Sequence, residues 1–298
     1  MNRGKLLLDI GGTFIKACLA DGKGTLIPGS FFSVPMDSAG KADVIIKSLT
    51  DSIRQGYDIA GKSGYGISGI GIAIPGPFDF EGGIPLMKHK FAAVYGRPLR
   101  EIIYGCGIVA TGTPVLFMHD VISMLSGEML YGNATGYGNS AIVALGTGLG
   151  FACCIDGKIR YSPMKSPAYP IYNLPYKDGI LEDYVSKRGF IKNYGIISGK
   201  VPDTGLTVED IGKMAENGDE AALETFGAVG SIIAANLKEF LKSKDIRCLL
   251  FGGQISKSFR YMKDSLDKGL SGMPIKITSA KHIDEATFYG LCGLLKNT

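Results

Sequence analysis

Two short glycine-containing segments of the 298-residue chain carry residue types that could bind phosphate. The first reads LLLDIGGTFIKACLADGKG and places Asp9 just before Gly11, Gly12 and Thr13. Because glycine lacks a Cβ, an anion can approach the backbone N–H groups of such a turn closely, and a threonine adds a hydroxyl donor. An ordinary hairpin turn is the alternative interpretation of either segment taken alone.

The second segment, ALGTGLGFACCIDGKI, repeats the first at a distance of 135 positions, so that Gly11 falls on Gly146 and Asp21 on Asp156. The shift gives six identities in fifteen positions, where ordinary residue frequencies give about one. Each copy reads as a strand, a glycine turn, a second strand and an Asp-Gly turn. No helix start or GK[ST] follows the first turn, which excludes a P-loop, and no G-x-G-x-x-G precedes a helix.

Asp9 breaks the symmetry of the two copies, because its counterpart is Ala144. A carboxylate beside a phosphate-binding turn repels the ligand unless a cation intervenes. Mg²⁺ fits that need because it prefers hard oxygen ligands and retains several waters. A turn-capping aspartate is the alternative.

A second candidate acid, Asp120, ends the predicted strand PVLFMHD and begins a helix with apolar spacing. A carboxylate at that position could accept a hydrogen bond from an alcohol and take its proton during phosphoryl transfer. Aspartate is also a favoured helix N-cap, and the residues alone support both interpretations equally.

The elements that must position these residues alternate between strands and helices, which predicts an α/β fold. Strands are expected at 67–77, 114–120, 248–253 and 274–280, and helices at 40–57, 120–131, 207–216, 219–243, 255–269 and 284–296. With the internal repeat, this predicts two duplicated lobes with a ligand-binding cleft between them. We expect residues 1–118 and 284–298 to form the N-terminal lobe and 119–283 the C-terminal lobe.

Composition excludes several other classes of protein. The net charge of +4 without a basic run argues against nucleic acid as the partner, and no apolar run is long enough to span a membrane. The chain enters a strand with no signal peptide ahead of it, so we expect a cytoplasmic protein. The six cysteines contain no C-x-x-C and lie mostly in apolar stretches, which predicts buried, reduced thiols.

Taken in order, the segments DIGGTFIK, GIAIPGPFD, HD, ALGTGLG and LLFGGQIS resemble the ROK (repressor, open reading frame, kinase) family of sugar kinases. The resemblance covers essentially the whole chain. It implies the actin-like ATPase fold of duplicated RNase H-like lobes, ATP with Mg²⁺, and a homodimer or a dimer of dimers. Only eight residues precede Asp9, so we expect the kinase branch rather than the repressors, which carry a DNA-binding segment there.

The resemblance also implies roles for individual residues. Asp120 would be the catalytic base. The residues on the nucleotide side would be Asp9, Gly11, Gly12, Thr13, Lys16, Gly146, Thr147, Gly148, Gly252 and Gly253. The residues on the sugar side would be Gly76, Pro77, Asp79, His119 and Glu182.

The chain departs from the family pattern on the sugar side. His119 stands where the family has an asparagine, and the region of the family's zinc motif, YNLPYKDGILEDYVSKRG, lacks cysteine and histidine, so we expect no zinc. Glu182 aligns with a sugar-contacting glutamate, although a glutamate at a surface helix N-terminus is the alternative.

The family's GE-x-GH motif is replaced by IRYSPMKSPAYPIYNLPY. Its four tyrosines, Tyr161, Tyr169, Tyr172 and Tyr176, suggest a rigid aromatic loop that stacks on a sugar or an aglycone. An ordered surface loop or a subunit contact is the alternative.

These features favour an ATP-dependent kinase acting on a hydroxyl of a hexose, an amino-sugar or a glycoside. A non-catalytic sugar or nucleotide sensor is the first alternative, although a sensor needs no base such as Asp120. An ATPase-like structural protein or chaperone of the same superfamily is the second, although such proteins are usually longer.

Overall fold

The chain folds into two compact units, which a computed structural model describes for residues 2–296. Unit 1 comprises Met1–Leu130, Tyr161–Ala168 and Glu285–Thr298, and unit 2 comprises Tyr131–Arg160 and Tyr169–Asp284. This division differs from the predicted lobes, because residues 119–130 and 161–168 group with unit 1 and residue 284 with unit 2.

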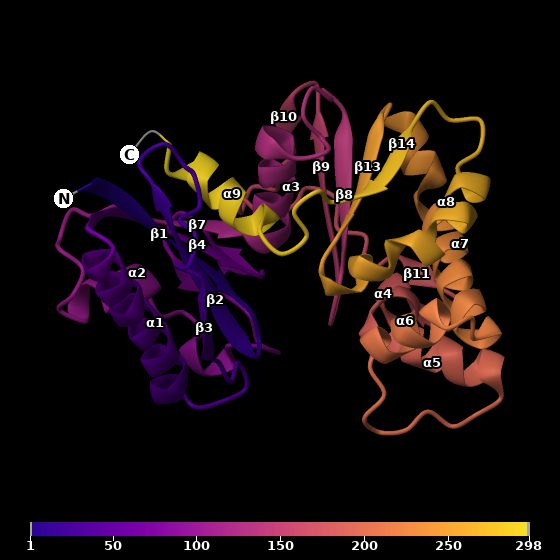
Figure 1. Ribbon diagram of the computed structural model, residues 1–298, viewed down its shortest axis with the longest axis horizontal. Helices are drawn as coiled ribbons and strands as arrows, with labels where there is room; N and C mark the ends of the chain where they lie inside the picture. Colours follow the sequence, from indigo (N-terminus) through magenta and orange to yellow (C-terminus); the bar gives the residue numbers. More distant parts are fainter. Residues whose placement is uncertain (1, 297–298) are drawn as a thin grey trace. The chain divides into compact units, whose positions relative to one another are not determined.

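Unit 1 is built on a five-stranded mixed sheet of order β3-β2-β1-β4-β7 (Figure 1). The central strand β1 (Asn2–Ile10) runs antiparallel to β2 (Phe14–Asp21) and parallel to β4 (Tyr65–Ile74). β3 (Phe32–Pro35) and β7 (Val115–His119) form the two edges. The hairpin β5–β6 (Phe78–Asp79 and Ile84–Pro85) follows β4.

Helices cover both faces of this sheet, as the apolar residues of β1 require. Leu6, Leu8 and Ile10 share a core with α1 (Ala42–Lys62), whereas Leu7 packs with α9 (Ala286–Leu294). Because successive side chains of a strand point to opposite faces, this near-continuous apolar run marks a strand buried on both sides. The remaining helical elements of the unit are η1 (Ala92–Val94), α2 (Leu99–Gly105) and α3 (Asp120–Tyr131).

Helix α3 packs on α9 with almost no space between the two backbones. A Cβ at Gly127 would overlap the carbonyl of Ala286, and one at Gly290 would overlap that of Ser123. The Ser123 hydroxyl donates to the carbonyl of Thr287 at 2.7 Å. These contacts fix α3, and with it Asp120 at its first turn, to the C-terminal helix.

Unit 2 repeats the sheet of unit 1 strand for strand, in the order β10-β9-β8-β13-β14. These strands span Lys158–Ile159, Leu149–Ile155, Ser140–Leu145, Cys248–Gly252 and Lys276–Ser279. As in unit 1, the first two long strands are antiparallel and the next two run parallel to the first. The equal order and directions confirm the duplication that the repeated glycine segments predict.

The repeat slips by one residue at the turn. Ile10 pairs with Ile15 across the first turn, but Leu145 pairs with Leu149 across the second, which is one residue shorter. After the turn, the structural equivalents are therefore 134 positions apart, as with Leu19, which shares a core with α1, and Cys153, which shares a core with α7. Cys18 and Cys153, which match in the sequence at a distance of 135 positions, therefore lie on opposite faces of their respective sheets.

The helices of unit 2 pack on one face of its sheet around α7 (Glu220–Ser243), as Figure 1 shows. They include α4 (Leu181–Val185), α5 (Lys187–Ser198) and α6 (Val208–Glu216), with the hairpin β11–β12 (Pro175–Tyr176 and Gly179–Ile180) before α4. The single helix predicted at 255–269 is two elements, η2 (Gln254–Tyr261) and α8 (Lys263–Gly269), which are separated by Met262. Within η2, Ser258 leaves the helical conformation. Helices α2, α4 and α5 were not predicted.

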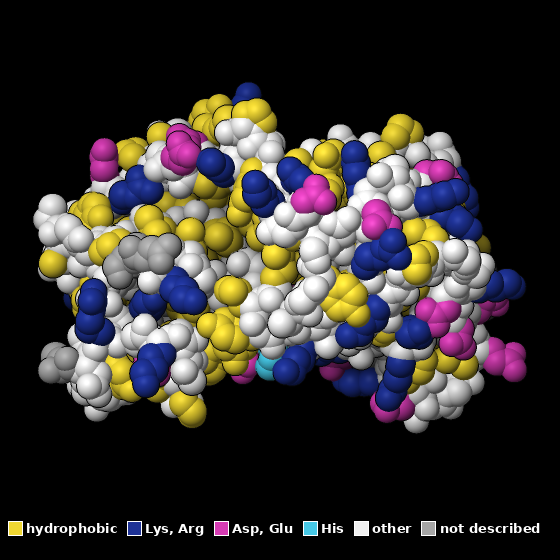
Figure 2. All heavy atoms as spheres, turned by 90° about the horizontal axis from the view of Figure 1, so that it is seen from above, with side chains coloured by type: hydrophobic (Ala, Val, Ile, Leu, Met, Phe, Trp, Pro, Cys, Tyr) yellow, Lys and Arg dark blue, Asp and Glu magenta, His cyan; other side chains and the backbone are white. Residues whose placement is uncertain are grey.

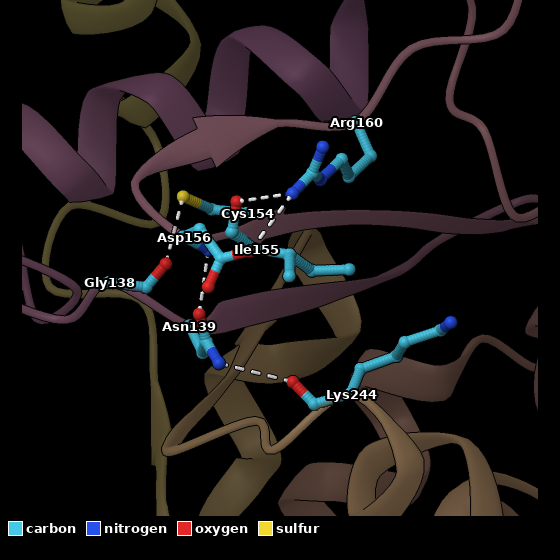
Figure 3. Close-up of polar contacts among 7 residues, drawn as sticks. All are labelled: Gly138, Asn139, Cys154, Ile155, Asp156, Arg160 and Lys244. Atoms are coloured by element: carbon cyan, nitrogen blue, oxygen red, sulfur yellow. Dashed lines mark hydrogen bonds and ion pairs between the residues drawn. The ribbon is translucent and has the colours of Figure 1, made fainter.

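The six cysteines are free thiols, and all but Cys106 are buried. Figure 3 shows how Cys154 lies beside the second Asp-Gly turn, with its Sγ 3.3 Å from the carbonyl of Gly138. Asp156 holds the turn at a positive φ of 54°, its N–H donating to Asn139 and its carboxylate pairing with Arg160. This thiol is therefore part of the packing under a turn.

Charged side chains are dispersed over the face of the molecule that Figure 2 draws. On the face drawn in Figure 2, Lys and Arg lie among acidic and hydrophobic groups instead of forming one patch. No helix within the described residues is long and apolar enough to cross a membrane.

Candidate functional site

Asp9 lies at the penultimate position of β1, partly buried, with Lys16 of β2 and Ala73 of β4 as its register partners. The pKa of Asp9 is raised to about 7, chiefly by burial and then by the negative charge of Asp120, while the Lys16 ammonium lowers it. The strand end thus brings together two predicted site acids and the predicted lysine.

Asp120 begins α3 directly after β7, and its carboxylate is oriented from both sides. The Oδ1 atom accepts from the N–H of Val121 at 2.7 Å and lies 2.7 Å from Nδ1 of His119. The ring N–H does not point at that oxygen, so the His119 contact is electrostatic rather than a well-aligned hydrogen bond. The Val121 contact joins adjacent residues, so it orients the carboxylate without forming the capping bond to Ile122 or Ser123 that an N-cap at Asp120 would make.

The pKa of the Asp120 carboxyl lies below its ordinary value. Burial acts in the opposite direction, but the charge of the neighbouring His119, the Val121 N–H and the Lys90 ammonium outweigh it. The side chain keeps 40% of its surface exposed, so the burial is partial. Asp120 is therefore ionised at neutral pH and open to an incoming hydroxyl group.

The Gly11–Thr13 turn is held through its carbonyl groups. The carbonyls of Gly12 and Thr13 accept from Ser38 and Met36 at 3.0 and 2.8 Å. Among the described residues, the N–H groups of Gly12 and Thr13 have no bonding partner within the chain. A turn anchored by its acceptors leaves its donors for an anion.

Gly76 follows β4 on the predicted sugar side. A Cβ at this position would lie 3.4 Å from Nε2 of His119 and 3.4 Å from Oγ of Ser166, so both polar atoms border the glycine. The next residue, Pro77, is joined to it by a cis peptide bond.

Asp79, also predicted on the sugar side, closes the β5–β6 hairpin. Its Oδ1 accepts from the N–H groups of Glu81 and Gly82 at 3.1 and 2.9 Å. This Asx turn accounts for the aspartate by local structure.

The tyrosine- and proline-rich segment divides between the two units. Tyr169 packs on Phe240 and Tyr176 on Tyr184, both within unit 2. Tyr161, by contrast, is exposed in the stretch 161–168 that belongs to unit 1. That stretch is tied to the β5–β6 hairpin by the ion pair of Lys165 with Glu81 at 3.7 Å.

The second glycine loop, Gly146–Gly148, joins β8 to β9 in unit 2. Its ends are tied by a bond from the Gly146 N–H to the Gly148 carbonyl at 3.1 Å. The N–H groups of Thr147 and Gly148 have no partner within residues 2–296. Both glycine turns therefore present adjacent free donors.

Glu182, predicted to contact sugar, lies against this loop. Its Oε2 accepts from the Leu149 N–H at 2.9 Å, and its Oε1 pairs with Arg188 at 3.1 Å. The side chain is only 22% exposed. The acceptor contact expected of Glu182 stays a prediction.

Gly252 and Gly253 end β13 beside the same loop. Gly252 pairs with Ala144 of β8, and a Cβ at Gly253 would overlap the carbonyl of Leu145. Gly253 also has a φ of 81°, so both its space and its backbone conformation require glycine. Unit 2 thus places the predicted glycine pair next to Gly146.

Comparison with known proteins identifies the family. The model of the ROK family matches residues 6–162 and 176–298. The chain belongs to the ROK family. This confirms the resemblance predicted from the ordered glycine and aspartate segments.

ROK proteins with different activities are similar in sequence to this chain. A glucokinase of Streptomyces coelicolor is 24% identical over 292 residues, covering 88% of this chain and 85% of the relative. The xylose repressor of Bacillus subtilis is 22% identical over 274 residues, covering 89% and 67%.

The structure of a ROK glucokinase from Streptomyces griseus with glucose and AMPPNP superposes with a TM-score of 0.81. It is 21% identical and covers 99% of this chain and 100% of the glucokinase. The fold is therefore the predicted actin-like ATPase fold of ROK proteins.

Three contributors to this ROK site were not predicted. Lys90 lowers the pKa of Asp120, Ser166 borders Gly76, and Arg188 pairs with Glu182. None belongs to a family motif quoted from the sequence, and each reaches its partner through folding rather than spacing. Two of them lay in segments where a family motif is replaced: Ser166 in that of the GE-x-GH motif and Arg188 in that of the zinc motif.

Proposed function

We propose that this ROK protein is an ATP-dependent sugar kinase that phosphorylates a hydroxyl of a hexose, an amino-sugar or a glycoside. The observation that carries the proposal is the ionised Asp120 carboxylate, oriented by Val121 and His119 at the start of α3. If Asp120 served only as an N-cap, its side chain would accept from the N–H of Ile122 or Ser123, but its described backbone contact is with the adjacent Val121.

Asp120 would act on the acceptor hydroxyl. Its oxygen would accept the hydroxyl hydrogen bond, align the nucleophile with the γ-phosphorus and take the proton as the oxygen–phosphorus bond forms. Its lowered pKa keeps it ionised for this purpose, which favours alignment of the nucleophile over early proton removal. His119 and Ser166, on either side of Gly76, would bind other hydroxyl groups of the acceptor.

The glycine turns would bind the nucleotide. The free N–H groups of Gly12 and Thr13 in unit 1, and of Thr147 and Gly148 in unit 2, would donate to phosphate oxygens. Lys16 would add positive charge beside the first turn, and the Gly252–Gly253 pair would lie against adenosine.

Asp9 fits the predicted Mg²⁺. The Asp9 carboxylate is partly buried beside a second acid, and its pKa is raised to about 7. A divalent cation would stabilise its ionised form. When bound with the nucleotide, Mg²⁺ supplies positive charge that offsets the phosphate charge. No group of three or more His, Cys, Asp or Glu side chains placed to hold a metal occurs within residues 2–296.

A non-catalytic sugar or nucleotide sensor is the second candidate, favoured by the relative that is a repressor and by the altered sugar motifs. The two are separated by ADP release with MgATP across a panel of hexoses, amino-sugars and glycosides, with mass spectrometry of the sugar product. The kinase predicts a phosphorylated sugar for at least one acceptor. Binding of ATP or sugar without any phosphorylated product would favour the sensor.

A further inference from the structure

We propose that Glu182 is a positioning residue of the second glycine loop and that Arg188 orients it, so that the pair sets nucleotide affinity rather than sugar affinity. This inference rests on the proposed nucleotide-binding role of Gly146–Gly148. It replaces the acceptor contact predicted for Glu182 from the family alignment.

The start of α5 and the adjacent α4 hold both ends of the loop. At its C-terminal end, the Leu149 N–H donates to Glu182 Oε2 at 2.9 Å. At its N-terminal end, the Gly146 carbonyl accepts from the Lys187 N–H at 2.9 Å. A Cβ at Gly148 would lie 2.8 Å from Glu182 Oε2, so the carboxylate lies directly against the loop backbone. The free donors of the loop lie between these two anchors.

Arg188 fixes the rotamer of Glu182. Its Nη2 lies 3.1 Å from Glu182 Oε1 and 2.6 Å from Asp183 Oδ1. Asp183 is itself held, because its Oδ2 accepts from the Ile180 N–H at 3.0 Å. The guanidinium thus joins the Glu182 carboxylate to that of Asp183 in the first turn of α4.

Arg188 has a second effect, which is electrostatic. An unpaired carboxylate beside a phosphate-binding loop would repel the nucleotide, and the guanidinium offsets that charge. With Oε2 on the Leu149 N–H and Oε1 on Arg188, the Glu182 carboxylate is held against the loop within unit 2. The geometry therefore assigns it to the loop.

The first test measures MgATP affinity by calorimetry, which needs no turnover. Hydrogen bonds to charged groups contribute about 1.5–3 kcal/mol, or roughly 10- to 100-fold, so Glu182→Ala should weaken MgATP binding by about that factor. Glu182→Gln keeps an acceptor for the Leu149 N–H and should lose only a few-fold. Arg188→Ala should weaken binding by an intermediate amount, Arg188→Lys should restore part of it, and the double alanine variant should bind no more weakly than Glu182→Ala alone.

Arg247→Ala is the matched control, since it removes an Arg–Asp pair of 2.8 Å in the same unit, away from the loop. Its MgATP affinity should stay within about two-fold of wild type. Hydrogen exchange provides a readout that is independent of ligands, because Leu149 should lose protection in Glu182→Ala but not in Arg247→Ala.

Three results would overturn the proposal. Wild-type protein that binds no MgATP would remove the role of the loop itself. Unchanged MgATP affinity in folded Glu182→Ala would remove the positioning role. A raised sugar KM in Glu182→Ala with an unchanged ATP KM would restore the acceptor contact. If MgATP binding responds as expected but no sugar is phosphorylated, the kinase proposal fails and the positioning proposal stands.

Discussion

At the scale of single residues, Asp9 makes the stability of the ligand-free protein depend on pH. Its pKa rises from 3.8 to about 7 on folding, so the folded state binds this proton more tightly than the unfolded state. The contribution of Asp9 to stability is therefore most favourable below pH 4, falls between pH 4 and 7, and is least favourable above that range.

We predict that Asp9→Asn, in chelator and without nucleotide, raises the melting temperature at pH 8 but changes it little at pH 4. A shift of this size corresponds to at most about 4 kcal/mol, and solvent access at the turn reduces it. Asp58→Asn, at an exposed position on α1, is the control. An Asp9→Asn protein that melts below wild type at pH 8 would contradict the assigned burial.

Ser166 should affect the acceptor rather than the nucleotide. We predict that Ser166→Ala raises the sugar KM by about 2- to 12-fold, the value of one neutral hydrogen bond, and leaves the ATP KM unchanged. Ser162→Ala is the matched control, because Ser162 lies in the same turn, its N–H donating to the Ser166 carbonyl at 2.8 Å. Equal effects of the two variants on sugar KM would show that the turn, not the Ser166 hydroxyl, matters.

At the scale of elements, the α3–α9 contact determines where Asp120 lies. We predict that Gly127→Ala and Gly290→Ala each destabilise the protein by about 2 kcal/mol or more, because the added Cβ would overlap backbone of the facing helix. Denaturant unfolding measures the change.

Gly61→Ala is the control for these variants. Gly61 lies within α1 with no atom in reach of an added Cβ, so this change should stabilise the protein by about 0.5–1 kcal/mol. If Gly127→Ala were as stable as Gly61→Ala, the two helices would not be in backbone contact.

The elements also show what the sequence could predict and why the rest could not be. The apolar strand before each glycine turn, and the strand ends that carry Asp9 and Asp120, follow from local pattern. The one-residue shift between the two glycine segments could not be predicted from local pattern. The second turn is one residue shorter, and this moves every later side chain to the other face of the sheet relative to the first copy. The ion pair of Glu182 could not be predicted, because its partner Arg188 lies on the next helix, α5.

At the scale of the whole molecule, two equal sheets of the same strand order establish a duplicated ROK fold. That fold alone does not determine activity, since glucokinases and a repressor share it. The repeat could be recognised in the sequence because turns and buried strands depend on local residue types. Function was harder to predict, because the sugar-side motifs of the family are replaced in this chain.

The measurement that tests the kinase proposal most directly is the rate of sugar-dependent ADP release by Asp120→Asn. Asparagine keeps the size of the side chain and an oxygen for the Val121 N–H, but it cannot take a proton. We predict that kcat falls by about 10²- to 10⁴-fold, while MgATP affinity and melting temperature stay close to those of wild type. An Asp120→Asn protein that phosphorylates sugar at nearly the wild-type rate would contradict the assignment of Asp120 as the base.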